Sequence, residues 1–67
     1  MTLEEAKQWI VAGCQIVYNG ITYLRAVALE FRYDRNKHDF VLFLILLDRN
    51  QNSVIRVPAE KCVPIPL

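Results

Sequence analysis

The first twelve residues carry apolar side chains at helical spacing. Thr2 and Glu5 have the separation of a capping box, and Gly13 stands where a left-handed C-cap is favoured. These signals predict a helix over residues 3–12. Its apolar face consists of Leu3, Ala6 and Ile10, with Trp9 at the edge. Because the opposite side is polar, we expect one face of this helix to dock against the rest of the chain.

After Gly13 the apolar pattern changes to one typical of strands. Residues 15–18 and 21–33 are rich in β-branched and aromatic side chains, and Asn19-Gly20 separates them. This dipeptide strongly favours a two-residue type I′ turn, so the two segments are predicted to form a hairpin. The turn sets the register, in which Tyr18 faces Ile21.

That register divides the side chains of the hairpin between two faces. One face is predicted to point into the core, and the face opposite to it carries Ala26 and Ala28. Their small side chains leave room for the helix to approach. The predicted inner face consists of Ile16, Tyr18, Ile21, Tyr23, Val27, Leu29 and Phe31.

The stretch 40–47 (FVLFLILL) contains no polar residue. Such a segment is prone to aggregate as a bare strand, so we expect a central strand that is covered on both sides. A polar loop, Asp34–Asp39, precedes it, and the turn 49–52 leads to a returning strand over 53–57. With Leu44 opposite Val57, the inward side chains would be Phe40, Leu42, Leu44 and Leu46.

The chain after Pro58 predicts a helical turn at 59–61 and a short edge strand at 63–65. The sequence VPAEKCVPI resembles the proline, helical turn and final strand that close SH3 domains. Gly13, Val17, Gly20 and Tyr23 are similar to the openings of small bacterial and phage barrels. The resemblance covers residues 13–67 and is to the SH3-like barrel family.

This resemblance implies a mainly β fold with one N-terminal helix and a small five-stranded SH3-like barrel. A chain of 67 residues has room for a single domain, with the helix at 1–12 and the barrel at 13–67. The family's Ala-Leu-Tyr-Asp-Tyr run is missing, and the single Trp lies in the helix. We therefore do not expect a polyproline-binding groove.

Charge and cysteine content narrow the function classes. Eight Lys and Arg against seven Asp and Glu give a net charge of +1, which argues against strong charge-driven binding to nucleic acid or membranes. No apolar run approaches the roughly 20 residues of a membrane helix.

The first residues do not have the pattern of a secretory leader. Cys14 and Cys62 lack metal-binding spacing and are predicted to be reduced, so we expect a cytoplasmic protein.

His38 is the only histidine, and it lies between Asp34 and Asp39 in the polar loop. An imidazole beside carboxylates can act as a general base or a metal ligand. A solvated loop residue is the simpler interpretation, because no nucleophile or second metal ligand accompanies it. The sequence predicts no enzyme, no cofactor, no metal and no small-molecule substrate.

The same loop combines cations with an aromatic side chain, as single-strand nucleic-acid binders do. The candidate nucleic-acid-binding residues are Arg32, Tyr33, Arg35, Lys37 and His38. Asp34 and Asp39 offset part of this charge, and a loop of this kind is also typical of a solvated surface. Nucleic-acid binding is therefore the alternative function.

The favoured function is a non-enzymatic protein-interaction module, with a protein partner or a second copy as its ligand. The short helix is too small to cover both the surface around Ala26 and Ala28 and the second face of the central strand. The face that stays uncovered is expected to mark an interface. The alternative is that the helix covers this second face. The candidate interface residues are Val41, Phe43, Ile45, Leu47 and Trp9.

Overall fold

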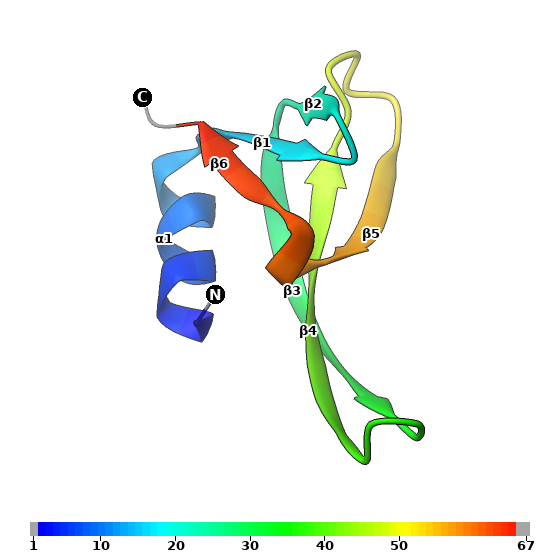
Figure 1. The fold of residues 1–67 in the computed structure, drawn as a ribbon. Helices are drawn as coiled ribbons and strands as arrows, with labels where there is room; N and C mark the ends of the chain where they lie inside the picture. Colours follow the sequence, from blue (N-terminus) through cyan, green and yellow to red (C-terminus); the bar gives the residue numbers. More distant parts are fainter. Residues whose placement is uncertain (1, 66–67) are drawn as a thin grey trace.

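A computed structural model describes residues 2–65, which contain one α-helix, six strands and one 3-10 turn (Figure 1). The predicted mainly β composition with an N-terminal helix is confirmed. In chain order the elements are α1 (Leu3–Ala12), β1 (Gln15–Tyr18), β2 (Ile21–Tyr23), β3 (Arg25–Asp34), β4 (Asp39–Leu47), β5 (Val54–Pro58), η1 (Ala59–Lys61) and β6 (Val63–Ile65).

Helix α1 begins and ends at the predicted residues. The Thr2 hydroxyl accepts a hydrogen bond from the Glu5 amide at 3.2 Å, and the Glu5 carboxylate accepts one from the Thr2 amide at 3.0 Å. These bonds hold the pKa of the Glu5 carboxyl below its usual range. Gly13 ends the helix with φ of 69°, a conformation that costs glycine little. Both ends are thus fixed by local hydrogen bonds.

The strands form two three-stranded sheets, in the orders β2-β1-β6 and β3-β4-β5. They do not close into one barrel, and the predicted strand 21–33 divides at Leu24 into β2 and β3. The Leu24 amide donates to the Leu47 carbonyl at 2.9 Å. Leu24 is therefore the point where the chain leaves the first sheet and joins the second.

Both predicted registers are confirmed. Tyr18 lies opposite Ile21, and the turn between them has positive φ at Asn19 and Gly20, as a type I′ turn requires. Leu44 lies opposite Val57.

The turn after β4 is closed by Asp48. Its carboxylate accepts from the Asn52 amide at 3.0 Å and from the Ser53 hydroxyl at 2.9 Å. The hydrogen bond from the Asn52 amide, together with that from Ser53, lowers the pKa of the Asp48 carboxyl. This turn fixes the register between β4 and β5.

The predicted faces of β3 are wrong at Ala26 and Val27, because the strand contains a bulge there. Ala26 pairs with Leu46 and Ala28 with Ile45, so Val27 is an extra residue that has no partner on β4. An extra residue reverses the alternation of side chains beyond it. Ala26, predicted on the opposite face, is buried in the core, whereas Val27, predicted inside, is exposed.

We call the side of the β3-β4-β5 sheet that carries Leu44 and Leu46 its inner face. Both side chains are fully buried there. Helix α1 contacts β3, and its Ala6 belongs to the same core, so the helix covers the inner face. The buried core consists of Ala6, Cys14, Ile16, Ala26, Leu44, Leu46, Val57, Ala59 and Cys62.

The β3–β4 hairpin continues beyond this core (Figure 1). Strand β5 pairs only with residues 43–47 of β4, so residues 39–42 have β3 as their one neighbouring strand. Phe31 and Phe40, both predicted to point inward into the core, are exposed there. They do share the inner face, but no element extends far enough to cover them. Ile21, at the end of β2, is also exposed against prediction.

Leu44→Ala tests the importance of the central strand. The fully buried side chain would leave a cavity, and we expect the free energy of unfolding to fall by about 2–5 kcal/mol. Urea unfolding measures this change. The matched control is Val11→Ala, because Val11 is 87% exposed, and its effect should stay within about 0.5 kcal/mol. Equal effects of the two substitutions would contradict the described core.

Candidate functional site: the hairpin groove

Three exposed aromatic side chains lie on the inner face of the projecting hairpin. Phe31, Tyr33 and Phe40 are 51%, 54% and 63% exposed. Tyr33 and Phe40 are cross-strand partners whose rings meet edge to face, with centroids 5.5 Å apart. Phe31 is two residues before Tyr33 on the same strand and lies opposite Leu42. The alternation of the strands thus produces a continuous aromatic surface.

Phe31 and Phe40 of this surface line one wall of a groove of about 400 Å³, which we call the hairpin groove. Its other wall comes from the body of the molecule, namely the first turn of α1 and the 3-10 turn η1. The groove therefore lies at the boundary between the part of the inner face that is covered and the part on the projecting hairpin that is exposed. It is lined by Leu3, Phe31, Lys37, Asp39, Phe40, Val41, Leu42, Ala59 and Glu60.

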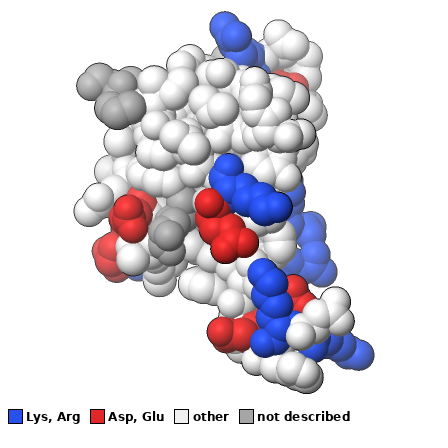
Figure 2. Space-filling model, viewed as in Figure 1, with Lys and Arg blue, Asp and Glu red and all other residues white. Residues whose placement is uncertain are grey.

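Lys37 and Asp39 line the hairpin groove at the tip end, and Glu60 lines it at the body end. At the tip of the hairpin, the Asp34 carboxylate accepts from the amides of Asn36 and Lys37 at 2.8 and 3.3 Å. Within residues 2–65, the cationic groups of Arg35 and Lys37 form no ion pair, and neither does Glu60 at the body end. Figure 2 shows basic and acidic side chains side by side over the projecting hairpin and near η1, and acidic side chains over the start of α1.

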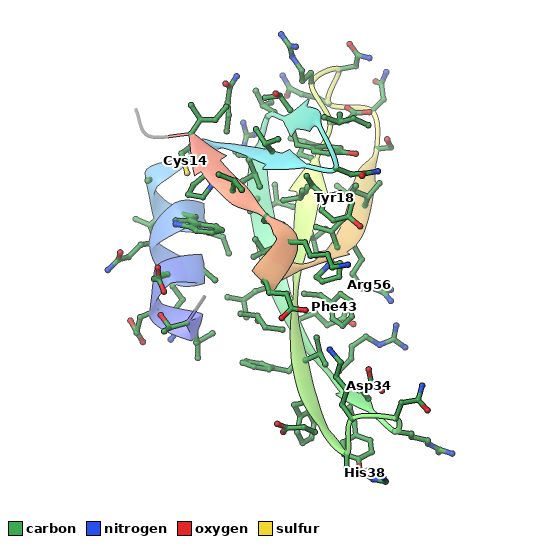
Figure 3. The ribbon with its side chains drawn as sticks, in the orientation of Figure 1. Cys14, Tyr18, Asp34, His38, Phe43 and Arg56 are labelled. Carbon is green, nitrogen blue, oxygen red and sulfur yellow. The ribbon has the colours of Figure 1, made fainter. Side chains whose placement is uncertain are left out.

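The predicted nucleic-acid-binding residues do not all line the same hollow. Arg32, Tyr33 and Arg35 line a second hollow of about 260 Å³ together with Asp34 and Phe43. Lys37 lines the hairpin groove instead, and His38 lies at the hairpin tip (Figure 3). Arg32 is ion-paired with Glu30 at 3.4 Å. The structure therefore brings together three of the five predicted residues.

The predicted interface row lies on the outer face of the same sheet. The row consists of Val41, Phe43, Ile45 and Leu47, and each member is only partly exposed. Helix α1 does not cover it. The cross-strand neighbours of Phe43, Val41 and Ile45 are Glu30, Arg32 and Arg56. Glu30 forms ion pairs with both arginines.

The aliphatic parts of arginine side chains cover apolar surface while their charges stay in water. The outer row is thus covered by side chains of its own sheet rather than by the helix. Trp9, predicted to join this row in an interface, packs against the core of its own chain. The most exposed aromatic side chains of the hairpin are on the inner face, whereas the outer row is partly exposed and stays a predicted interface.

His38 is exposed and adopts a positive φ of 54° in the turn. Among residues 2–65, no three His, Cys, Asp or Glu side chains come together as a metal site would require. Cys14 and Cys62 are free and buried, with their thiols directed at the Trp9 and Pro58 carbonyls. Burial raises the pKa of the Cys62 thiol to about 11, the opposite of the shift that activates a nucleophilic cysteine.

Sequence reasoning missed Phe31 and Phe40 as surface residues, because alternation places them on the face of the core. The lengths of the strand segments could have indicated this exposure. The central hairpin strands have ten and nine residues, whereas the strand beside them has five. At about 3.3 Å per residue, the hairpin must extend past its neighbour.

No helix within residues 2–65 combines the length and apolarity needed to cross a membrane. No protein-family model matches this chain, and neither a curated protein nor a solved structure matches it significantly.

The raised pKa of Cys62 predicts how the protein responds to alkali. The unfolded thiol ionises near pH 9 and the folded one near 11, so the free energy of unfolding should fall as pH rises between these values. Cys62→Ala should show a smaller fall in urea unfolding measured at pH 8, 9 and 10. Cys14→Ala serves as the matched buried-thiol control. An unchanged pH dependence for Cys62→Ala would contradict the assignment.

Proposed function

We propose that this protein is a non-enzymatic, cytoplasmic protein-interaction module with an SH3-like barrel topology, and that its ligand binds the hairpin groove. The strand order supports this topology. β1 is flanked by β2 and β6, β2 runs into β3 with one residue between them, and η1 joins β5 to β6. Two sheets joined in this way are the support for assigning an SH3-like topology to the chain. The free thiols of Cys14 and Cys62 support a reducing compartment.

The observation that carries the proposal is the uncovered aromatic surface of Phe31, Tyr33 and Phe40. A two-stranded hairpin is marginally stable in water unless its apolar face packs against something. Exposed apolar surface rimmed by polar side chains marks interaction sites, and aromatic side chains are enriched in them. Here the aromatic surface borders a groove with charged groups at both ends. These are the features of a site that receives an apolar segment of a protein.

A photocrosslinking side chain in place of Phe40, introduced into the full chain in its native host, tests this function. We expect crosslinks to one protein species, because a ligand in the hairpin groove contacts this position. The matched control carries the same photocrosslinker at Val11, which is also highly exposed and lies on α1. The same weak crosslinking pattern from both positions would contradict the proposal.

A second candidate function is binding of single-stranded nucleic acid at the hairpin tip. The specific observation in its favour is that Arg32, Tyr33 and Arg35 line one hollow, so that a base can stack beside guanidinium groups.

Fluorescence titration with a labelled oligo-dT at low salt tests the second candidate. We expect Arg35→Ala to weaken binding about three- to tenfold and to reduce its salt dependence, because one phosphate contact is lost. Arg49→Ala is the matched control, since Arg49 is an exposed arginine in the turn between β4 and β5. Absence of binding by the unmodified chain at low salt would exclude this function.

A further inference from the structure

Strand β4 has an unpaired edge beside the hairpin groove. Strand β5 pairs with β4 only as far as Phe43, because β5 ends at Pro58 and the chain turns there into η1. Within residues 2–65, the stretch 40–42 therefore has β3 as its one ladder partner. We call the other side of this stretch the open edge. A strand edge presents backbone N–H and C=O groups to any extended segment that lies beside it.

The alternation of the ladder identifies the backbone groups that point to the open edge. The Asp48 amide donates to the Ser53 carbonyl at 3.1 Å, so the backbone of Asp48 points to the β5 side. The carbonyl of the preceding residue, Leu47, instead accepts on the β3 side. Every second residue of β4 points the same way, so the backbone groups of Phe40 and Leu42 point to the open edge.

One of these groups already has a partner that takes the place of a strand. The Phe40 amide donates to the carboxylate of Asp39 at 2.7 Å, whereas in a sheet it would donate to the carbonyl of a neighbouring strand. Within residues 2–65, no turn, loop or side-chain hydrogen bond engages the Leu42 amide, the Leu42 carbonyl or the Phe40 carbonyl. These three groups are free to bond the backbone of a ligand.

The hairpin groove follows the open edge. It is lined by four consecutive residues of β4, 39–42, whereas a hollow above one face of a strand is lined by alternate side chains. Its wall on the body of the molecule includes Ala59 and Glu60, which follow β5 directly in the chain. The groove therefore occupies the place that a longer β5 would fill.

The open edge also lacks the features by which proteins block the addition of a strand. Those features are charged side chains, prolines and bulges. The residues at 40–42 are Phe, Val and Leu. On the other edge of the same hairpin, β3 carries Glu30 and Arg32 and has a bulge at Val27. Of the two edges of the hairpin, the one on β4 is thus the one suited to strand addition.

We propose that the hairpin groove binds an extended segment of a partner protein, which adds to β4 as a strand beside residues 40–42. The backbone of this segment bonds the free groups of Leu42 and Phe40, and its alternate apolar side chains pack against Phe31 and Phe40 on the inner face. Lys37 and Asp39 lie together at the tip end, so backbone pairing rather than charge selects the ligand. The inference rests on the proposed function, since it names the form in which the ligand binds.

Random ten-residue peptides displayed on phage are the probe, with the full chain as the target. We expect the enriched peptides to carry apolar residues at alternate positions and no proline between them. In a synthetic copy of an enriched peptide, N-methylation at successive positions should weaken binding about tenfold at every second one and leave it within about twofold at the others. The reason is that alternate amides of a strand point to opposite sides.

An ester in place of the Leu42 amide, in the chemically synthesised full chain, tests the same edge from the side of the protein. The ester removes the free N–H and keeps the leucine side chain, so peptide binding should weaken about three- to tenfold. The matched control is an ester at Val54, which is exposed and whose amide, by the same alternation, points away from β4. This control should bind the peptide like the original chain, and circular dichroism should show that both esters are folded.

Absence of enriched peptides, helical spacing of their apolar residues, or N-methylation without an alternating effect would each overturn the inference. So would a Leu42 ester that binds the peptide as well as the Val54 ester does. If the photocrosslinker at Phe40 captures one protein in any of these cases, the proposed function stands and only strand addition is excluded. If it captures none, both are overturned. Self-association that the Leu42 ester abolishes, measured by analytical ultracentrifugation, would place a second copy at the open edge and overturn the partner segment.

Discussion

The structure depends on the burial of β4, whose residues 40–47 are apolar on both faces. β3 pairs with the whole of this stretch on one side, and β5 pairs with residues 43–47 on the other. On the inner face Leu44 and Leu46 are buried beneath α1 and the first sheet. On the outer face two ion pairs centred on Glu30 lie over the apolar row. Exposed ion pairs contribute little stability, so the hydrocarbon of the arginine side chains provides most of this cover.

The covering elements are shorter than the strand they cover, and this mismatch produces the candidate site. Ten helical residues span about 15 Å, whereas ten residues of a strand span about 33 Å. The hairpin therefore leaves the body of the molecule with its inner face still apolar. Phe31, Tyr33 and Phe40 are the result. Such a surface is costly in a monomer, and it is explained if a ligand completes its burial.

Features governed by neighbours in sequence could be predicted from the sequence. The capping box, the Asn19-Gly20 turn and the register across Asp48 depend on contacts within a few residues, and all are found as predicted. The bulge at Val27 could not be predicted, because nothing local distinguishes it from a regular strand residue. The exposure of Phe40 depends on where separate elements end, and the cover of the outer row depends on ion pairs between strands. Reasoning from alternation alone therefore found the correct face for Phe31 and Phe40 but not their exposure.

Native-state amide hydrogen exchange along β4, measured by NMR on a dilute sample, tests most directly whether its cover ends where the structure places it. Amides that lie within the covered part, between Leu44 and Leu47, should exchange only through global unfolding. Those of residues 40–42 should exchange much faster through local opening, and they should gain protection as the groove becomes occupied. Uniform protection from Phe40 to Leu47 in the dilute protein would contradict this account.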